Sequence, residues 1–414
     1  MTRSTHKPPE RVAVVGAGMV GLSTAWFLQD AGVEVTVLER SAVAAGSSWG
    51  NAGWLTNSLA APLPDPSVLK FGIRAVLSPS SPIYVPPTAD PRTLRWLARF
   101  ARNCTSARWN KAMQGMLPLI RDALPAFDAL EAGGVAARTR AADPLTAAFP
   151  SARDSKGLLE EFAHLEASGR PVDFEILDGA DARNSEPALN DAITRVVRFR
   201  GERFIDPARY VRAIADSLRA RGGRIVEGVE VQEVRSTRSG VTVAGEEYDS
   251  VVLAHGAWIN RLARQVGVKQ IVQAGRGYSF TAEVDQLPQG PIYFPGQKVA
   301  CTPIGDRLRI AGTMEFRDVG APGDPRRMRS LVSQARALLR GAHIDDRQDE
   351  WVGARPCTAD GLPLIGAGND PRVHVAGGHG MWGVFLGPVS GRLLAEEIVT
   401  GHRPAALSAV DPLR

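Results

Sequence analysis

The chain has 414 residues, of which 44% are hydrophobic and 22% are charged, and its formal net charge is +5 at pH 7. This composition is typical of a folded protein, and the length exceeds what one ordinary hydrophobic core holds, so we expect two domains. The basic residues are scattered rather than clustered with aromatic residues, which argues against nucleic acid as a partner and leaves an anionic small molecule or cofactor.

The first informative stretch is RVAVVGAGMVGLSTAWFLQDAGVEVTVLER, which predicts a strand, a glycine turn, a helix and a second strand. In its GxGxxG motif, Gly16 makes the tight turn, Gly18 lets the backbone approach a pyrophosphate, and Gly21 permits close packing of the helix on the strand. Phosphates bind at the N-terminus of such a helix, and Glu39 would accept hydrogen bonds from ribose hydroxyls. The stretch predicts a dinucleotide site, and which dinucleotide stays open at this point.

The next segment, SAVAAGSSWGNAGWL, consists mostly of small residues. A flexible linker would have this composition, but it would not need Asn51, Ala52 and Gly53 between the two tryptophans Trp49 and Trp54. We expect the backbone of this segment to lie against a flat ligand, with the tryptophans as walls.

The segment PRTLRWLARFARN predicts a helix with Arg92, Arg95, Arg99 and Arg102 on one face. Such a face is most often solvated, and it is also suited to contact with an anionic membrane surface. Both interpretations stay open, and the second would place the protein at the periphery of a membrane.

Regular structure returns at residue 203. Asp206 and Pro207 predict the cap and first residue of a helix that ends at Gly222 and Gly223. The short strand patterns RIVEG, VEVQEVRS and VTVA follow, and YDSVVLAHGAW predicts a buried strand that ends in a glycine turn. Short antiparallel strands between two Rossmann strands are typical of flavin domains, and the backbone near Val231 would then adjoin the adenine ring.

Residues 268–350 alternate short strands such as GYSFTAEV and RLRIAGTM with loops and end in the helix MRSLVSQARALLR, which predicts a separate antiparallel sheet. The segment WVGARPCTADGLPLIG then leads to the strand VHVAGG and the glycine cluster around His379. That cluster is compatible with a phosphate loop, a metal site or a helix cap. A metal site is disfavoured because His379 has no second ligand at a suitable spacing.

The cysteines, Cys104, Cys301 and Cys357, lie far apart and form no CxxC pair. They indicate neither a zinc site nor a disulfide framework, so we expect no metal and a reducing compartment, the cytoplasm, with peripheral contact at the inner face of the membrane left open.

Four of these segments together, the GxGxxG stretch ending in Glu39 and Arg40, SSWGNAG, GARPCTADGLPLIG and GHGMWG, resemble the FAD-dependent D-amino acid dehydrogenase family. This family belongs to the wider group of D-amino acid, glycine and sarcosine oxidases. GRGYSFTAEV at residues 275–284 also looks like a strand of that family, and the resemblance runs from Arg11 to about Gly401.

The resemblance implies an α/β fold with an added antiparallel sheet: an FAD-binding, Rossmann-type domain like that of glutathione reductase, interleaved with a substrate domain as in D-amino acid oxidase. We assign residues 11–60, 105–170, 203–267 and 350–414 to the FAD-binding domain, residues 61–104, 171–202 and 268–349 to the substrate domain, and residues 1–10 to a flexible N-terminus.

The resemblance also implies non-covalent FAD, since Cys357 does not match the linking cysteine of sarcosine oxidases. It matches Arg355 and Tyr278 to residues that hold a substrate carboxylate, although Arg355 could instead pair with Asp360 and Tyr278 could be a packing residue. His379 and its neighbours would stabilise negative charge near N1 and O2 of the reduced flavin. The expected FAD-binding residues are Gly16, Gly18, Met19, Val20, Gly21, Glu39, Arg40, Ser47, Ser48, Asn51, Ala52, Gly53, Leu55, Val231, Ala254, Gly256, Trp258, Gly378, Gly380, Met381, Trp382 and Gly383.

The implied reaction is oxidative deamination of an amino acid by hydride transfer from the α-carbon to flavin N5. A D-amino acid or a cyclic imino acid is the expected substrate, and a quinone or oxygen is the expected electron acceptor. An oxygen-using glycine or sarcosine-type oxidase and a flavin-bound electron-transfer or structural subunit remain as alternatives. The sequence does not address the oligomeric state.

Overall fold

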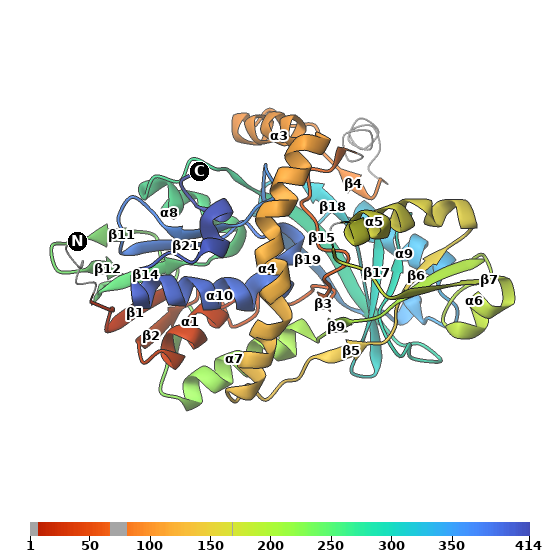
Figure 1. Cartoon of the computed structure of the whole chain (residues 1–414), viewed down its shortest axis with the longest axis horizontal. Coiled ribbons are helices and arrows are strands. Elements are labelled where there is room, and N and C mark those ends of the chain that lie inside the picture. Colours follow the sequence, from red (N-terminus) through yellow and green to blue (C-terminus); the bar gives the residue numbers. More distant parts are fainter. Residues whose placement is uncertain (1–6, 67–80, 168) are drawn as a thin grey trace.

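The computed structural model describes residues 7–66, 81–167 and 169–414. Its first layer is a six-stranded sheet in the order β10-β2-β1-β14-β21-β20, in which the first five strands are parallel and β20 is antiparallel to β21. This sheet lies at the left of Figure 1, together with the C-terminus. Its strands are β1 (Arg11–Val15), β2 (Glu34–Leu38), β10 (Arg224–Val226), β14 (Ser250–Leu253), β20 (Leu364–Ala367) and β21 (Val373–Gly377).

One face of this sheet is covered by helices whose buried side chains form a single large core. The helices α1 and α10 pack directly against each other, and α4 packs on α10. The other side carries α8 and a small antiparallel sheet, β11-β12-β13, inserted between β10 and β14. The elements of both layers are α1 (Met19–Asp30), α4 (Ser106–Ala132), α7 (Pro207–Ala220), α8 (Asn260–Gln265), α10 (Gly383–Thr400), β11 (Val234–Ser236), β12 (Val241–Val243) and β13 (Glu246–Tyr248).

The second large layer, at the right of Figure 1, is a mainly antiparallel sheet in which the pairs β16–β6 and β18–β4 are parallel. Its main path is β19-β15-β18-β17-β16-β6-β8-β7, and β4 adds to β18. The helices α5, α6 and α9 belong to this half, and α3 lies at the upper edge of the picture. The bounds are β4 (Ile83–Tyr84), α3 (Pro91–Asn103), β6 (Leu145–Phe149), α5 (Lys156–Ala167), β7 (Phe174–Asp178), α6 (Gly179–Ser185), β8 (Arg195–Phe199), β15 (Val272–Ala282), β16 (Ile292–Phe294), β17 (Val299–Ile304), β18 (Arg307–Phe316), α9 (Pro325–Leu338) and β19 (Gln348–Thr358).

The fold confirms the predicted class, a Rossmann-type layer interleaved with an antiparallel sheet. Two strands differ from the predicted domain assignment. β6 and β19 fall in sequence ranges that were assigned to the FAD-binding domain, but both pair within the second large sheet. A third small sheet, β3-β9-β5, lies next to the crossing helix α4 in Figure 1. Its strands are β3 (Trp54–Leu55), β5 (Arg140–Ala142) and β9 (Glu202–Phe204).

Three helices begin with the same local device. Asp90, Asp206 and Asp324 cap α3, α7 and α9, and in each case the aspartate side chain accepts a backbone N–H bond while a proline occupies the first helical turn. The prediction of α7 is confirmed. The predicted helix 328–340 begins three residues earlier, because Asp324 and the following proline set its start.

One strand prediction fails in part. Of VEVQEVRS, only Val234–Ser236 pairs as a strand. The preceding residues cross the carboxyl edge of the six-stranded sheet, where the N–H of Val229 donates to the carbonyl of Glu39 at 2.9 Å. Because the Val229 N–H bonds to Glu39, this residue does not take part in the β11–β12 ladder.

The packing of α1 on α10 generates a stability prediction. A Cβ at Gly391 would lie 2.6 Å from the backbone nitrogen of Thr24, so Gly391→Val should force the two helices apart and cost about 1–3 kcal/mol or more. Urea denaturation would measure this loss. The control is Gly157→Ala in α5, where a Cβ meets nothing within 4 Å, so the change should be neutral or stabilise by up to about 1 kcal/mol. A Gly391→Val protein as stable as the parent would contradict the close packing.

Candidate functional site

The glycine turn between β1 and α1 has the geometry that its motif predicts. Gly16 has φ 111°, and a Cβ there would lie 2.6 Å from the carbonyl oxygen of Ala254, directly after the neighbouring strand β14. A Cβ at Gly21 would lie 2.0 Å from the carbonyl oxygen of Gly16. Gly16 therefore permits the turn, and Gly21 permits the approach of helix to strand.

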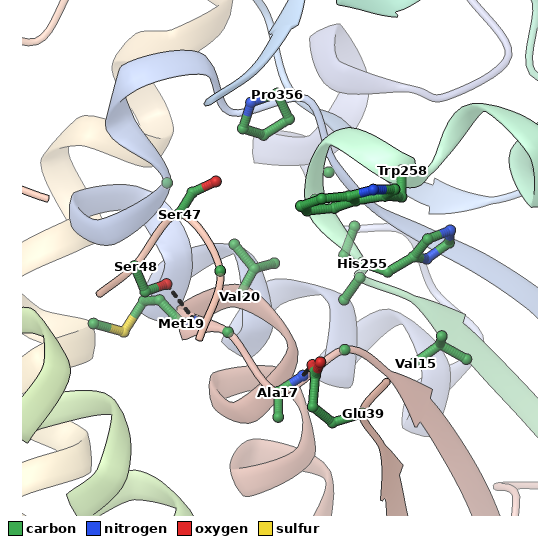
Figure 2. Close-up of a pocket in the computed structure, with 18 of the residues that line it drawn as sticks. Val15, Ala17, Met19, Val20, Glu39, Ser47, Ser48, His255, Trp258 and Pro356 are labelled. Carbon is green, nitrogen blue, oxygen red and sulfur yellow. Dashed lines mark hydrogen bonds between the residues drawn. The ribbon is translucent and has the colours of Figure 1, made fainter. Parts of the chain in front are cut away.

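A cavity of about 390 Å³ opens at the carboxyl ends of β1, β2, β14 and β21. Figure 2 shows Ser47 and Ser48 on one side of it, Trp258 and His255 on the other, and Glu39 below. Its size is within the range of small-molecule sites, and its place at the carboxyl edge of a parallel sheet is where α/β folds bind ligands.

Most of the predicted site residues line this cavity. They are Gly16, Gly18, Met19, Val20, Glu39, Arg40, Ser47, Ser48, Asn51, Val231, Ala254, Gly256, Trp258, Arg355, His379, Gly380, Met381 and Gly383.

The remaining predicted residues do not line it. Gly21 acts in helix packing, as described, and Leu55 is fully buried in β3. The carbonyl of Ala52 accepts a 2.7 Å hydrogen bond from the hydroxyl of Thr302, and the N–H of Gly53 donates to Asn51 Oδ1 at 2.8 Å. Two further residues, Gly378 and Trp382, line a separate cavity of about 10 Å³ that shares His379, Gly380 and Met381 with the large one.

The two tryptophans that were expected to wall the ligand point to the antiparallel sheet instead. Trp49 packs on Trp351, with ring centroids 6.4 Å apart, and the indole N–H of Trp54 donates to the Thr302 hydroxyl at 2.8 Å. The hydroxyl of Ser47 also donates to the carbonyl of Ala354 in β19. The segment 47–54 therefore joins the cavity to the antiparallel sheet.

Hydrogen bonds connect the glycine turn after β1 to Glu39, the acidic residue that follows β2. Glu39 accepts hydrogen bonds from the N–H groups of Ala17 at 2.8 Å and Ser41 at 2.9 Å, and the N–H of Met19, the first residue of α1, donates to the Ser48 hydroxyl at 3.2 Å. Backbone N–H groups at a helix N-terminus favour an anion.

Sequence reasoning missed several residues at the end of the cavity near Trp258, among them His255 and Arg261. The guanidinium of Arg40 lies 3.8 Å from the Trp258 ring centroid. Burial, with the nearby charges of Arg261 and Arg40, lowers the pKa of His255 to about 4, and its Nδ1 has no hydrogen-bond partner among the described residues. A polar residue directly after the buried strand VVLA was the signal for His255.

Arg355 lies on β19 and lines the same cavity. Burial lowers the pKa of its guanidinium, and its one hydrogen bond to a described residue runs from Nη1 to the carbonyl of Thr313 at 3.4 Å. Asp360, the alternative partner considered from the sequence, instead pairs with Arg414 at 2.9 Å. Among the described residues, no carboxylate lies within ion-pair distance of Arg355. An arginine in this setting favours an anionic ligand.

Tyr278 is not brought together with Arg355. Side chains alternate between the faces of a strand, and β15 and β19 keep an unbroken register from Val272 to Ser279, so Gly277 shares the face of Arg355 and Tyr278 takes the other. Tyr278 is 1% exposed, donates to Glu315 at 2.8 Å and accepts from the N–H of Asp324 at 2.8 Å. It is a buried residue between the sheet and α9.

His379 lies just before α10. Its Nε2 is 2.9 Å from the Ser390 hydroxyl, which itself donates to the carbonyl of Leu386 at 2.7 Å. Ser390 must therefore accept from His379, which places the ring proton on Nε2. Burial lowers the pKa of His379 to about 4, so the ring is neutral at pH 7.

The residues fit a dinucleotide. A turn whose space a Cβ would fill, the N-terminus of α1, and the arginines Arg40, Arg261 and Arg355 in the cavity lining suit a ligand with phosphates. Within the described ranges, no group of three or more His, Cys, Asp or Glu side chains is arranged to hold a metal ion. No helix in these ranges has the length and apolarity that crossing a membrane requires.

Comparisons with known proteins identify the family of the chain. The family model of FAD dependent oxidoreductases matches residues 11–397. A D-amino acid dehydrogenase of Azorhizobium caulinodans is 31% identical over 95% of this chain and 97% of its own length, and one of Agrobacterium fabrum is 30% identical over 95% and 96%. Among solved structures, glycine oxidase from Geobacillus kaustophilus has a TM-score of 0.75 at 22% identity, covering 98% of this chain and 99% of its own. The resemblance read from the four motifs is confirmed: the chain belongs to the family of FAD-dependent oxidoreductases, and FAD is its cofactor.

Proposed function

We propose that this protein oxidises an amino acid at its α-carbon, with a D-amino acid or a cyclic imino acid as the substrate class. The observation that carries the proposal is Arg355, a largely desolvated guanidinium without a carboxylate partner among the described residues, in a cavity that fits a dinucleotide. A planar guanidinium binds a carboxylate with two parallel hydrogen bonds. The D-amino acid dehydrogenases that resemble the chain support the substrate class.

In this proposal the cavity holds FAD non-covalently, through the residues of the glycine turn, Glu39, Arg40 and the segment 47–51. Bound FAD supplies the acceptor for the substrate hydride. The thiol of Cys357 is buried, and burial raises its pKa to about 12, which keeps it protonated and unreactive. Backbone N–H groups at the start of α10, rather than the neutral ring of His379, then provide the positive potential at that end of the cavity.

The test is anaerobic reduction of the FAD-loaded protein by a panel of D- and L-amino acids, N-methyl amines and proline derivatives. Bleaching of the flavin by an amino or imino acid supports the proposal and identifies the substrate. If no compound bleaches the flavin, an electron-transfer or structural subunit is favoured instead. Peroxide formation under air would identify an oxidase, and its absence with turnover on a quinone would identify a dehydrogenase.

Arg355→Lys should raise KM for the best substrate by roughly 10- to 150-fold, because lysine cannot reproduce the paired hydrogen bonds, each of about 1.5–3 kcal/mol to a charged group. Steady-state kinetics measure this, with the FAD content checked by absorbance. Tyr278→Phe is the control: it removes a buried hydrogen bond on the other face of the sheet, so it should lower stability and leave KM unchanged. An unchanged KM in Arg355→Lys would remove Arg355 from the site.

His379 should make stability depend on pH in the acid range. In the unfolded chain its pKa is about 6.5, and in the folded protein about 4, so below pH 6.5 the unfolded state binds the proton first. The free energy of unfolding should fall as the pH drops from 6.5 to 4 and stay level above 6.5, with His379 contributing at most about 1.4 kcal/mol per pH unit.

Urea denaturation of FAD-loaded protein between pH 4.5 and 8 would measure this slope. His379→Gln should reduce the slope, whereas substitution of the exposed His164 in α5 by glutamine should not. Equal slopes for the parent and His379→Gln would contradict a neutral, buried His379.

We also propose that α3 contacts an anionic membrane surface. Thr93, Trp96 and Phe100 are buried, while Arg92, Arg95, Arg99 and Arg102 are exposed and have no ion-pair partner among the described residues; Leu94, 48% exposed, adds an apolar side chain. The helix lies at the outer edge of the molecule in Figure 1. Each basic residue near such a surface contributes about 1 kcal/mol.

The triple variant Arg92→Gln, Arg95→Gln, Arg99→Gln should therefore bind phosphatidylglycerol vesicles at least tenfold more weakly than the parent in co-sedimentation at low salt. A matched variant that loses three exposed arginines of α7, Arg209, Arg212 and Arg219, should bind like the parent. Equal loss in both variants would indicate attraction by overall charge, and no binding by the parent would reject the membrane contact.

A further inference from the structure

The side chain of Arg355 lies across the neighbouring strand β15 at Gly277, which has no side chain. Arg355 pairs with Gly275 across the β19–β15 ladder, and a Cβ at Gly277 would lie 2.0 Å from Arg355 Nη1 and 2.2 Å from its Cζ. The guanidinium therefore rests directly on the backbone of β15. It reaches past that strand to the carbonyl of Thr313 in β18, 3.4 Å from Nη1.

Thr313 has an unusual backbone. Its φ is 52°, in the left-handed region that β-branched residues avoid. It lies where the register between β15 and β18 shifts, between Arg276 and Tyr278. Such a conformation costs of order 1–3 kcal/mol and persists where the surrounding structure requires it, often next to a functional site. The Thr313 hydroxyl is buried without a hydrogen-bond partner among the described residues, so a local side-chain hydrogen bond does not explain the conformation.

In a regular ladder, carbonyl groups lie in the plane of the sheet and point to the next strand. The register shift releases the carbonyl of Thr313 from the β15 ladder, and it accepts from a side chain on the face of Arg355. This bond uses one of the five N–H groups of the guanidinium. The others have no partner among the described residues, which leaves an edge for two parallel bonds to a carboxylate.

We propose that Gly277 and Thr313 are positioning residues for Arg355: Gly277 provides the path for the side chain, and the carbonyl of Thr313 fixes the orientation of the guanidinium. This inference rests on the proposed function, in which Arg355 binds the substrate carboxylate. It adds that the strained turn at Thr313 and the missing side chain at Gly277 set the affinity for the carboxylate.

The main test is Gly277→Ala in the FAD-loaded protein. The added methyl group displaces the guanidinium. KM for the substrate that the flavin-reduction panel identifies should therefore rise about 10- to 100-fold, as for loss of a hydrogen bond to a charged group. The dissociation constant of propionate, which is alanine without its amino group, should rise by a similar factor when measured by the change in flavin absorbance. FAD content should be unchanged.

Gly312→Ala is the matched control, because it adds the same methyl group to the adjacent strand β18. That Cβ would lie 2.8 Å from a methyl group of Leu331 in α9, away from Arg355. The control should lose stability and keep the parent KM. A combined Gly277→Ala, Arg355→Lys variant should be no worse in KM than Arg355→Lys alone, because both changes act on the same group.

Thr313→Gly supplies a second test that does not depend on the folding of Gly277→Ala. Glycine suits φ 52° and keeps the carbonyl but no longer restricts the backbone there, so the variant should fold with unchanged FAD content, and KM and the dissociation constant of propionate should both rise about two- to fivefold. Parent values of both constants would overturn the role given to Thr313.

The outcomes separate the two proposals. If Arg355→Lys leaves KM unchanged, the proposed function fails. If Arg355→Lys raises KM while Gly277→Ala leaves both KM and propionate binding at the parent values, Arg355 binds the carboxylate and the positioning proposal is wrong.

Discussion

The constraint on which the site depends is that the partly buried Arg355 guanidinium, whose pKa burial lowers, faces the cavity with no carboxylate within ion-pair distance among the described residues. Removing a guanidinium from water costs several kcal/mol, and one long hydrogen bond to a carbonyl offsets only part of this. The protein tolerates the cost because the rest of the fold stabilises the arrangement. In the proposed function, the substrate carboxylate offsets the remainder when it binds.

The other face of the sheet supplies part of that stability. On the other face at the register shift, the Tyr278 hydroxyl joins Glu315 of β18 to Asp324, the N-cap residue of α9, and Arg276 lies 3.6 Å from the same carboxylate. Glu315 is fully buried. This network holds β15 and β18 together at the position where their ladder is interrupted. Tyr278 thus contributes to the stability of the sheet on the face away from Arg355, and its hydroxyl has both its donor and its acceptor used.

The sequence predicts local features well and the faces of long strands poorly. The GxGxxG turn, the Asp–Pro helix start at Asp206 and the short sheet between β10 and β14 follow from neighbouring residues, and the structure agrees with each. Tyr278 was misplaced because a motif match does not fix which face of β15 points to the cavity; that depends on the register with β19, a partner about 75 positions away. The conformation of Thr313 depends likewise on a long-range shift, and the tryptophans of segment 47–54 found their partners on strands far along the chain.

The titratable groups near Arg355 also constrain the chemistry at neutral pH. His379 has a pKa of about 4 and its ring proton is engaged by Ser390, while burial raises the pKa of Cys357 to about 12. Neither group exchanges a proton readily at pH 7, since one is already neutral and the other remains a thiol. The ionisation that governs an α-oxidation here is then that of the substrate amine, which must lose its proton before its lone pair can assist departure of the α-hydrogen. In the proposed function, the Arg355 side chain fixes the carboxylate and limits which amino acids present that amine correctly, so that selection is by orientation rather than by acid–base exchange.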